Sequence, residues 1–291
     1  MDRAQQLSEF LKTRRAHLRP EDVGVGNFGG QRRVPGLRRE ELALLAGVSV
    51  DYYTRLEQGR ARNASPDILD AVAAALRLDG DERAHLHNLA KPASTRRRPS
   101  RPQQVGPEMR QALQALATIP AYIIGRRLDI LAWNSLARTL IADFPALPAA
   151  ERNMARLVFL DDASKDLYPD WESKARDTVS NLRLDAGRHP DDPRLATLVG
   201  ELSLGSADFR RLWADHNVRG KTRGRKRFNH PQLGELALDY VAMRAPDDPD
   251  MTMMIYSAPP GSEAAITLQL LASLTTPSVP GTADLPAGST L

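Results

Sequence analysis

The stretch "EELALLAGVSVDYYTRLEQGR", residues 40–60, decides how the first third of this chain folds. Ala43 supplies the small side chain that two closely crossing helices need, and four residues later Gly47 can take the left-handed conformation that ends a helix. Val48 can fill the turn and Ser49 can cap the next helix. Tyr53 and Leu56 follow at a three-residue spacing and point back to the core. This pattern predicts a helix-turn-helix, two short helices at a steep angle around a tight turn.

Four side chains of the second helix remain on its outer face: Val50, Asp51, Thr54 and Arg55. In a helix-turn-helix this N-terminal part of the second helix meets base edges in the major groove of DNA. Arg55 can pair with a guanine, Asp51 can accept from a cytosine amine, and Val50 or Thr54 can touch a thymine methyl. Polar and basic neighbours are predicted to grip phosphates, namely Gln31, Arg32, Arg33, Arg38, Arg39, Arg60 and Arg62.

The charge of the chain is unevenly spread. Residues 1–106 hold 19 Lys and Arg against 13 Asp and Glu, whereas the remainder holds 21 against 23. A local excess of positive charge favours a polyanionic partner for that segment. Double-stranded DNA is therefore the expected partner of the N-terminal region. The alternative is a helical hairpin that docks on another protein.

The ending "LEQGR", residues 56–60, resembles the motif of the xenobiotic-response-element family of helix-turn-helix regulators. The resemblance covers about residues 5–90 and implies a five-helix bundle in which the four outer residues named above contact bases. A long loop, "RPEDVGVGNFGGQRRVPG" at 19–36, departs from that pattern. It contains a formal G-x-G-x-x-G at Gly24, Gly26 and Gly29, but no strand precedes it, so no nucleotide cofactor is expected.

Composition divides the chain into four parts. Residues 1–90 are predicted to form the all-α helix-turn-helix domain, and the proline-rich, basic segment 91–107 an extended linker. Residues 108–275 are predicted to begin with two short strands around a Gly-Arg-Arg turn, to continue as helices to about 216, and to end with two strands and a helix. This order favours an α+β domain. The tail at 276–291 is predicted to be disordered.

Several segments of the second domain resemble the ligand-binding domain of MmyB-like transcription regulators. They are "AWN" at 132–134, "DW" at 170–171, "FRRLWADHNV" at 209–218, "HPQLGELALDY" at 230–240 and "APPGS" at 258–262. The resemblance implies a PAS-like fold, an antiparallel sheet with helices packed over a pocket, and a fatty-acid-like ligand, which is known for the family. Candidate pocket residues are Trp133, Asn134, Leu157, Phe159, Leu182, Arg183, Phe209, Trp213 and His230. The alternative for each of them is an ordinary core or turn position.

The sequence carries no sign of catalysis. It has no cysteine, no Gly-x-Ser-x-Gly motif and no phosphate-binding loop. His85 and His87 face different sides of a helix, so no metal is expected either. The absence of a signal peptide or a long apolar run favours a cytoplasmic protein without membrane contact.

The predicted function is thus a sequence-specific transcription regulator whose second domain senses a small apolar ligand. It is expected to act as a homodimer, because operators are commonly two-fold symmetric. The competing prediction is a protein-interaction module with a solid, non-sensing C-terminal domain.

Overall fold

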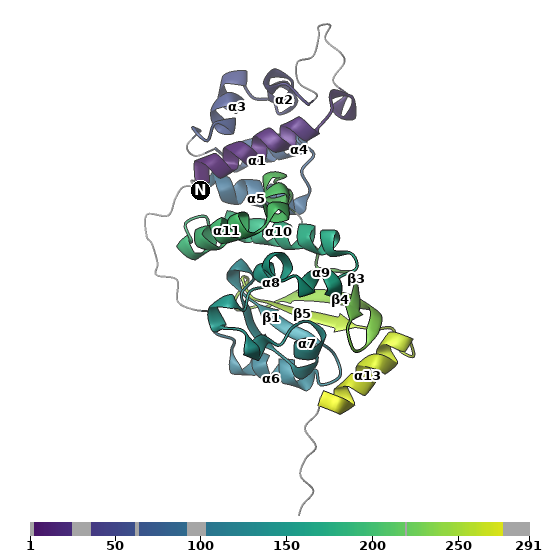
Figure 1. The fold of residues 1–291 in the computed structure, drawn as a ribbon. Coiled ribbons are helices and arrows are strands. Elements are labelled where there is room, and N and C mark those ends of the chain that lie inside the picture. The colour runs from purple at the N-terminus through teal and green to yellow at the C-terminus, as the bar shows by residue number, and fades with distance from the viewer. Residues whose placement is uncertain (1–2, 25–35, 62–63, 92–102, 219, 276–291) are drawn as a thin grey trace, which may run out of the picture.

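The computed structural model describes residues 3–24, 36–61, 64–91, 103–218 and 220–275. Figure 1 shows a helical head at the N-terminal end and a sheet at the other, with helices α10 and α11 lying between them. The predicted tail at 276–291 lies outside the described residues. None of the helices in the described ranges is long and apolar enough to cross a membrane.

The head is all α-helical, as predicted. Ser65 caps the fourth helix by accepting a hydrogen bond from the Ile68 amide at 3.4 Å, and Pro66 occupies its first turn. Asp79 and Glu82 form a reciprocal capping box at the start of the fifth helix. The five α-helices of the described part are α1 (Arg3–His17), α2 (Arg39–Leu45), α3 (Val50–Glu57), α4 (Pro66–Ala75) and α5 (Gly80–Ala90), with a short 3-10 turn, η1, at Pro20–Val23.

The second domain departs from the prediction in two places: helix α6 precedes the first strand, and three strands, where two were predicted, precede the final helix. The rest of the predicted order of strands and helices is confirmed. The first part of this domain contains α6 (Pro107–Ala115), β1 (Ala121–Ile124), η2 (Arg126–Leu128), β2 (Ile130–Trp133), α7 (Ser135–Leu140), η3 (Phe144–Ala146) and η4 (Ala149–Glu151). The helical part contains α8 (Met154–Leu160), α9 (Ala163–Leu167), α10 (Trp171–Arg188), α11 (Pro193–Gly205) and α12 (Ala207–Ala214). The last part contains β3 (Arg223–His230), β4 (Gly234–Arg244), β5 (Thr252–Ser257) and α13 (Glu263–Thr275).

The five strands form one antiparallel sheet in the order β2-β1-β5-β4-β3. Alternate residues of β1 serve its two faces: Tyr122 belongs to the large core under α8 to α12, whereas Ala121 and Ile123 pack with Leu113 of α6. The basic segment at 220–227 enters β3, and β3 pairs with β4 as a hairpin. The α+β prediction is confirmed.

The two domains share buried surface. Leu184 of α10 and Val218 belong to the same apolar cluster as Phe10 and Leu86 of the head. Within the predicted linker, Val105 is buried against the sheet. The head therefore rests on helix α10 and not only on the chain that joins the two domains.

Candidate DNA interface and ligand pocket

The turn of the helix-turn-helix has the predicted geometry. Gly47 adopts a left-handed φ of 65°, and Ala43 is fully buried where α2 approaches α3. The Ser49 hydroxyl accepts a hydrogen bond from the Tyr52 amide at 3.1 Å and so caps α3. Tyr53 is fully buried and, together with Leu56, holds the inner face of α3 in the core.

A buried carboxylate fixes α3 against its neighbours. Glu57 is fully buried, and its two oxygens accept hydrogen bonds from Arg15 Nε of α1 at 2.7 Å and Arg39 Nε of α2 at 2.5 Å. Burial opposes ionisation of Glu57, but the two arginines outweigh it and hold its pKa below the usual value. Gly59 approaches α1 so closely that a Cβ there would lie 2.5 Å from the Ala4 carbonyl oxygen. The "LE" and "G" of the motif therefore serve the packing of the head.

The four predicted base-contacting residues lie at the outer face of α3. Val50 is 48% exposed, and Thr54 is half-buried. Asp51 and Arg55 are exposed and form an ion pair of 3.0 Å between Oδ2 and Nη2, one helical turn apart. The acidic member of this pair thus orients the arginine along the face of the helix.

The predicted phosphate contacts lie partly outside the described residues, where Gln31, Arg32, Arg33 and Arg62 are found. Arg60 is exposed beyond the end of α3. Arg38 Nη1 lies 3.5 Å from Glu40 Oε1 at the start of α2, and Arg39 leaves 44% of its side chain exposed while binding Glu57. The described cations therefore flank α2 and α3 without covering the outer face of α3.

The second domain contains an apolar cavity of about 390 Å³ beside α8, α9 and the end of β3. Of the predicted pocket residues, Leu157 and His230 line it. Both ring nitrogens of His230 already have partners in the protein, because Nε2 contacts the Thr139 carbonyl and Nδ1 accepts hydrogen bonds from the Gln232 and Leu233 amides. Two other lining side chains, Ser164 and Tyr168, carry buried hydroxyls that have no hydrogen-bond partner among the described residues.

The other predicted pocket residues lie elsewhere in the domain. Phe159, Leu182 and Phe209 are buried in the large core. Asn134 is 3% exposed and caps α7 while bonding the backbone of residues 116, 119 and 121. Trp133 stands against Phe144, with ring centroids 5.1 Å apart.

Arg183 and Trp213 meet at the side of the domain that faces the head. The Arg183 guanidinium lies 4.1 Å from the centre of the Trp213 ring and also bonds the Trp213 carbonyl and His216 Nδ1 at 2.9 Å. On the head side, Arg14 donates to the His216 carbonyl at 2.6 Å. This contact joins α1 to α10 and the segment after α12.

A second contact at the same boundary depends on a glycine. A Cβ at Gly187 of α10 would lie 2.3 Å from His85 Nδ1, so only glycine allows α5 and α10 to approach this closely. His85 is 3% exposed, and burial followed by the charge of Arg183 lowers its pKa to about 3. As predicted, His87 points elsewhere and bonds Asp70 at 2.6 Å.

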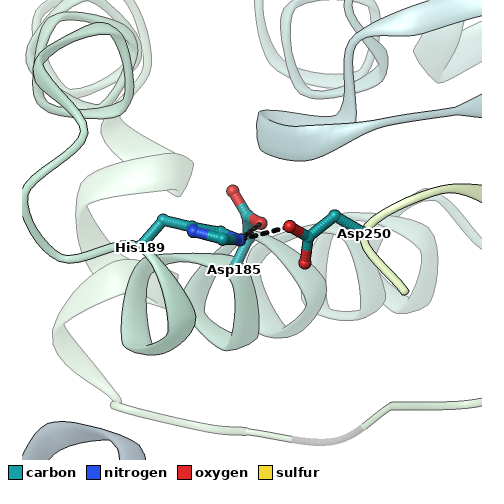
Figure 2. A group of neighbouring side chains, drawn as sticks. All are labelled: Asp185, His189 and Asp250. Carbon is teal, nitrogen blue, oxygen red and sulfur yellow. Dashed lines mark ion pairs between the residues drawn. The ribbon is translucent and has the colours of Figure 1, made fainter. Parts of the chain in front are cut away.

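Figure 2 shows a cluster of three side chains where α10 ends, in which His189 points towards Asp250 and Asp185. Their ligand atoms lie within 4.8 Å of one another, and His189 Nε2 is 2.7 Å from Asp250 Oδ2. Sequence patterns did not predict this cluster: Asp185 lies in the last turn of α10, and His189 directly follows the end of that helix. Asp250 already pairs with Arg126 at 3.0 Å, so the cluster is built as an ion-pair network that ties the turn before β5 to α10.

A helix-turn-helix joined to a covered antiparallel sheet with internal cavities defines a DNA-binding transcription regulator with a small-molecule domain. Comparison with protein families supports both parts. Residues 6–86 match a helix-turn-helix domain, and residues 105–271 match the MmyB-like transcription regulator ligand binding domain. The second match covers more than half of the chain, which therefore belongs to this family. A comparison with curated proteins found no match.

Proposed function

We propose that the protein recognises a specific operator through Val50, Asp51, Thr54 and Arg55. The observation that carries this proposal is the division of α3 into two faces. Its inner face is locked by the buried Glu57 and the core, whereas its outer face presents a charged pair and an apolar side chain to solvent. A rigid helix with exposed polar groups along its outer face suits contact with base edges.

The proposed effector is a fatty-acid-like molecule whose chain occupies the apolar cavity. Leu140, Leu157, Val158 and Leu167 contribute apolar walls to it. Each methylene buried there contributes about 0.8 kcal/mol. The unpartnered hydroxyls of Ser164 and Tyr168 lie among these walls and offer contacts for a polar atom of the ligand.

In the proposed mechanism, two copies bind the two halves of an operator. A ligand that favours one arrangement of the second domain shifts the population of that arrangement. Because α10 packs against both the sheet core and the head, such a shift changes the spacing of the two α3 helices.

Binding to a set of operator variants tests the base contacts. We expect Arg55→Ala to lose about 1–3 kcal/mol at one guanine-containing position and little elsewhere. Arg38→Ala, the matched control at a predicted phosphate contact, should weaken all sequences equally and reduce the salt dependence of binding. Uniform losses from both variants would contradict the assignment of the outer face.

A salt titration separates this proposal from a protein-docking module. Affinity for duplex DNA should fall steeply as salt rises, because bound counterions are released from the phosphates. A protein that binds no duplex at low salt would overturn the proposal.

A further inference from the structure

A second, smaller cavity of about 130 Å³ lies between α10 and the sheet. Unlike the apolar cavity, it is walled on one side by a polar face of α10. This face repeats every three or four residues, as one side of a helix must. The polar side chains that α10 contributes are Lys174, Asp177, Thr178, Asn181, Asp185 and Arg188.

Positive charge at one end of this polar cavity is only partly balanced. Lys226 Nζ and Lys221 Nζ both contact Asp177, at 2.6 Å and 2.9 Å. Lys174 is 7% exposed, and its ammonium has neither a hydrogen bond nor an ion pair with any described residue. Its nearest favourable contact is the Tyr168 ring, 5.1 Å from Nζ to the centroid. The carboxylate of Asp177 thus pairs with two lysines, whereas the third lysine, Lys174, is buried without an ion pair.

A buried ammonium without a partner is energetically unfavourable. Burial, and after it the charge of Lys226, lowers the pKa of Lys174 to about 7, and Asp177 only partly opposes this effect. An anion in the polar cavity would provide the missing partner. The hydroxyls of Tyr240 and Tyr256 belong to side chains of the opposite wall and can add hydrogen bonds.

We propose that the polar cavity binds the anionic group of a small molecule, a carboxylate or a phosphate, against the ammonium of Lys174. The proposal rests on the proposed function, since it assigns a chemical class to part of the ligand that this domain binds. Met154 lines both the polar and the apolar cavity. The two cavities are therefore neighbours, and the proposal extends to a single amphiphile with its acidic head in the polar cavity and its apolar chain in the other.

The polar cavity also adjoins the DNA-binding head. Leu184 lines the cavity and packs in the apolar cluster of the head. Gly220 lines it too, and the Gly220 amide donates to Asp81 of the head at 2.7 Å. An anion bound to Lys174 consequently acts on α10, the helix that also packs against the head.

Calorimetric titration of the full chain with sodium octanoate, octan-1-ol and sodium phosphate tests the proposal. Lys174→Met removes the charge and keeps the length of the side chain. Lys165→Met is the matched control, because Lys165 also faces an aromatic ring, at 5.5 Å, but is 55% exposed and lines neither cavity. We expect Lys174→Met to weaken octanoate binding about tenfold or more, as loss of a charge-assisted contact requires. Lys174→Met should bind octanol as tightly as the natural chain does. Lys165→Met should bind all three probes as tightly as the natural chain does.

The three probes distinguish the sources of the anion. Octanoate that binds more tightly than octanol, in a manner that depends on Lys174, indicates an acidic amphiphile. Phosphate that binds alone, with the same dependence, indicates a free anion. If neither octanoate nor phosphate depends on Lys174, the proposal is overturned. Octanol binding that survives this result would leave the apolar sensing function standing.

Discussion

The head and the ligand-binding domain each bury a charged side chain, but they treat it differently. In the head, Glu57 is fully buried and receives two arginines, Arg15 and Arg39, from two other helices. In the ligand-binding domain, Lys174 is nearly as buried but forms no ion pair with any described residue, and Asp177 acts on it only from a distance. The charge of Glu57 is thus neutralised by ion pairs within the chain, whereas the charge of Lys174 is not.

The difference follows from what burial does to a charge. A buried ion keeps its charge when neighbours replace the lost water, and it titrates towards neutrality when they do not. The lowered pKa of Glu57 and the lowered pKa of Lys174 show these two outcomes, since one shift favours the charged form and the other favours the neutral form. A paired charge therefore marks a structural position, whereas an unpaired one marks a position that an external group can complete.

The largest expected effect is the loss of the paired charge. Glu57→Ala leaves two arginines of the head without their common partner and should lower the free energy of unfolding by about 3–5 kcal/mol. Glu172→Ala is the matched control, because Glu172 also lies near two arginines, Arg176 and Arg211, but is 53% exposed. Its loss should stay below about 1 kcal/mol in urea denaturation. Equal losses in the two variants would remove the distinction between buried and exposed pairs.

Removal of the unpaired charge of Lys174 is expected to raise the free energy of unfolding, not to lower it. The pKa of Lys174 is about 7 in the folded protein and about 10.4 in the unfolded chain. The buried ammonium therefore destabilises the folded protein fully below about pH 7, and this destabilisation disappears as the pH rises to about 10. Lys174→Met should therefore stabilise the ligand-free protein by about 2–4 kcal/mol at pH 7. The difference in the free energy of unfolding between this variant and the natural chain should decrease as the pH rises towards about 10.

Thermal unfolding over this pH range provides the measurement. Lys165→Met should track the natural chain at every pH. A destabilised Lys174→Met protein would mean that the ammonium is satisfied in the folded chain, and the comparison with Glu57 would then fail.

The smallest expected effect concerns the boundary between the two regions. Gly187→Ala places a methyl group against the His85 ring and should cost about 1–3 kcal/mol through overpacking. Gly200→Ala, on α11, meets nothing within 4 Å and should stabilise the protein by up to about 1 kcal/mol. Limited proteolysis between the domains should be faster for Gly187→Ala alone. Unchanged proteolysis together with unchanged stability would mean that α5 and α10 can separate at no cost.

Sequence patterns predicted the local structure of both regions well. Ala43, Gly47 and Ser49 carry conformational signals within a few residues, and the structure confirms each of them. The acidic pairs Asp161–Asp162 and Asp191–Asp192 are typical of turns and helix starts, and Asp161 and Asp192 each accept a hydrogen bond from a backbone amide two residues further on. The glycine and glutamate of "LEQG" were visible in the motif, although their packing role was not assigned.

The proposed ligand-binding site was predicted less completely. Leu157 and His230 line the apolar cavity, but Lys174, Ser164 and Tyr168 were not singled out. A lysine in the polar sequence "WESKARDTVSN" carries no sign that it will be buried. Its environment is set by β3 and β4, more than forty residues further along the chain.

The sequence by itself determined the helix-turn-helix, most of the order of strands and helices, and the membership of the family. These properties depend on short-range signals such as caps, turns and the spacing of apolar residues, which the chain carries wherever it folds. Only the tertiary structure decided which charges are paired, where the cavities lie, and that the head rests on α10. Whether a charged side chain is buried, and whether it is paired, depends on which distant segments meet in the fold. The sequence therefore does not distinguish the paired charge of Glu57 from the unpaired charge of Lys174.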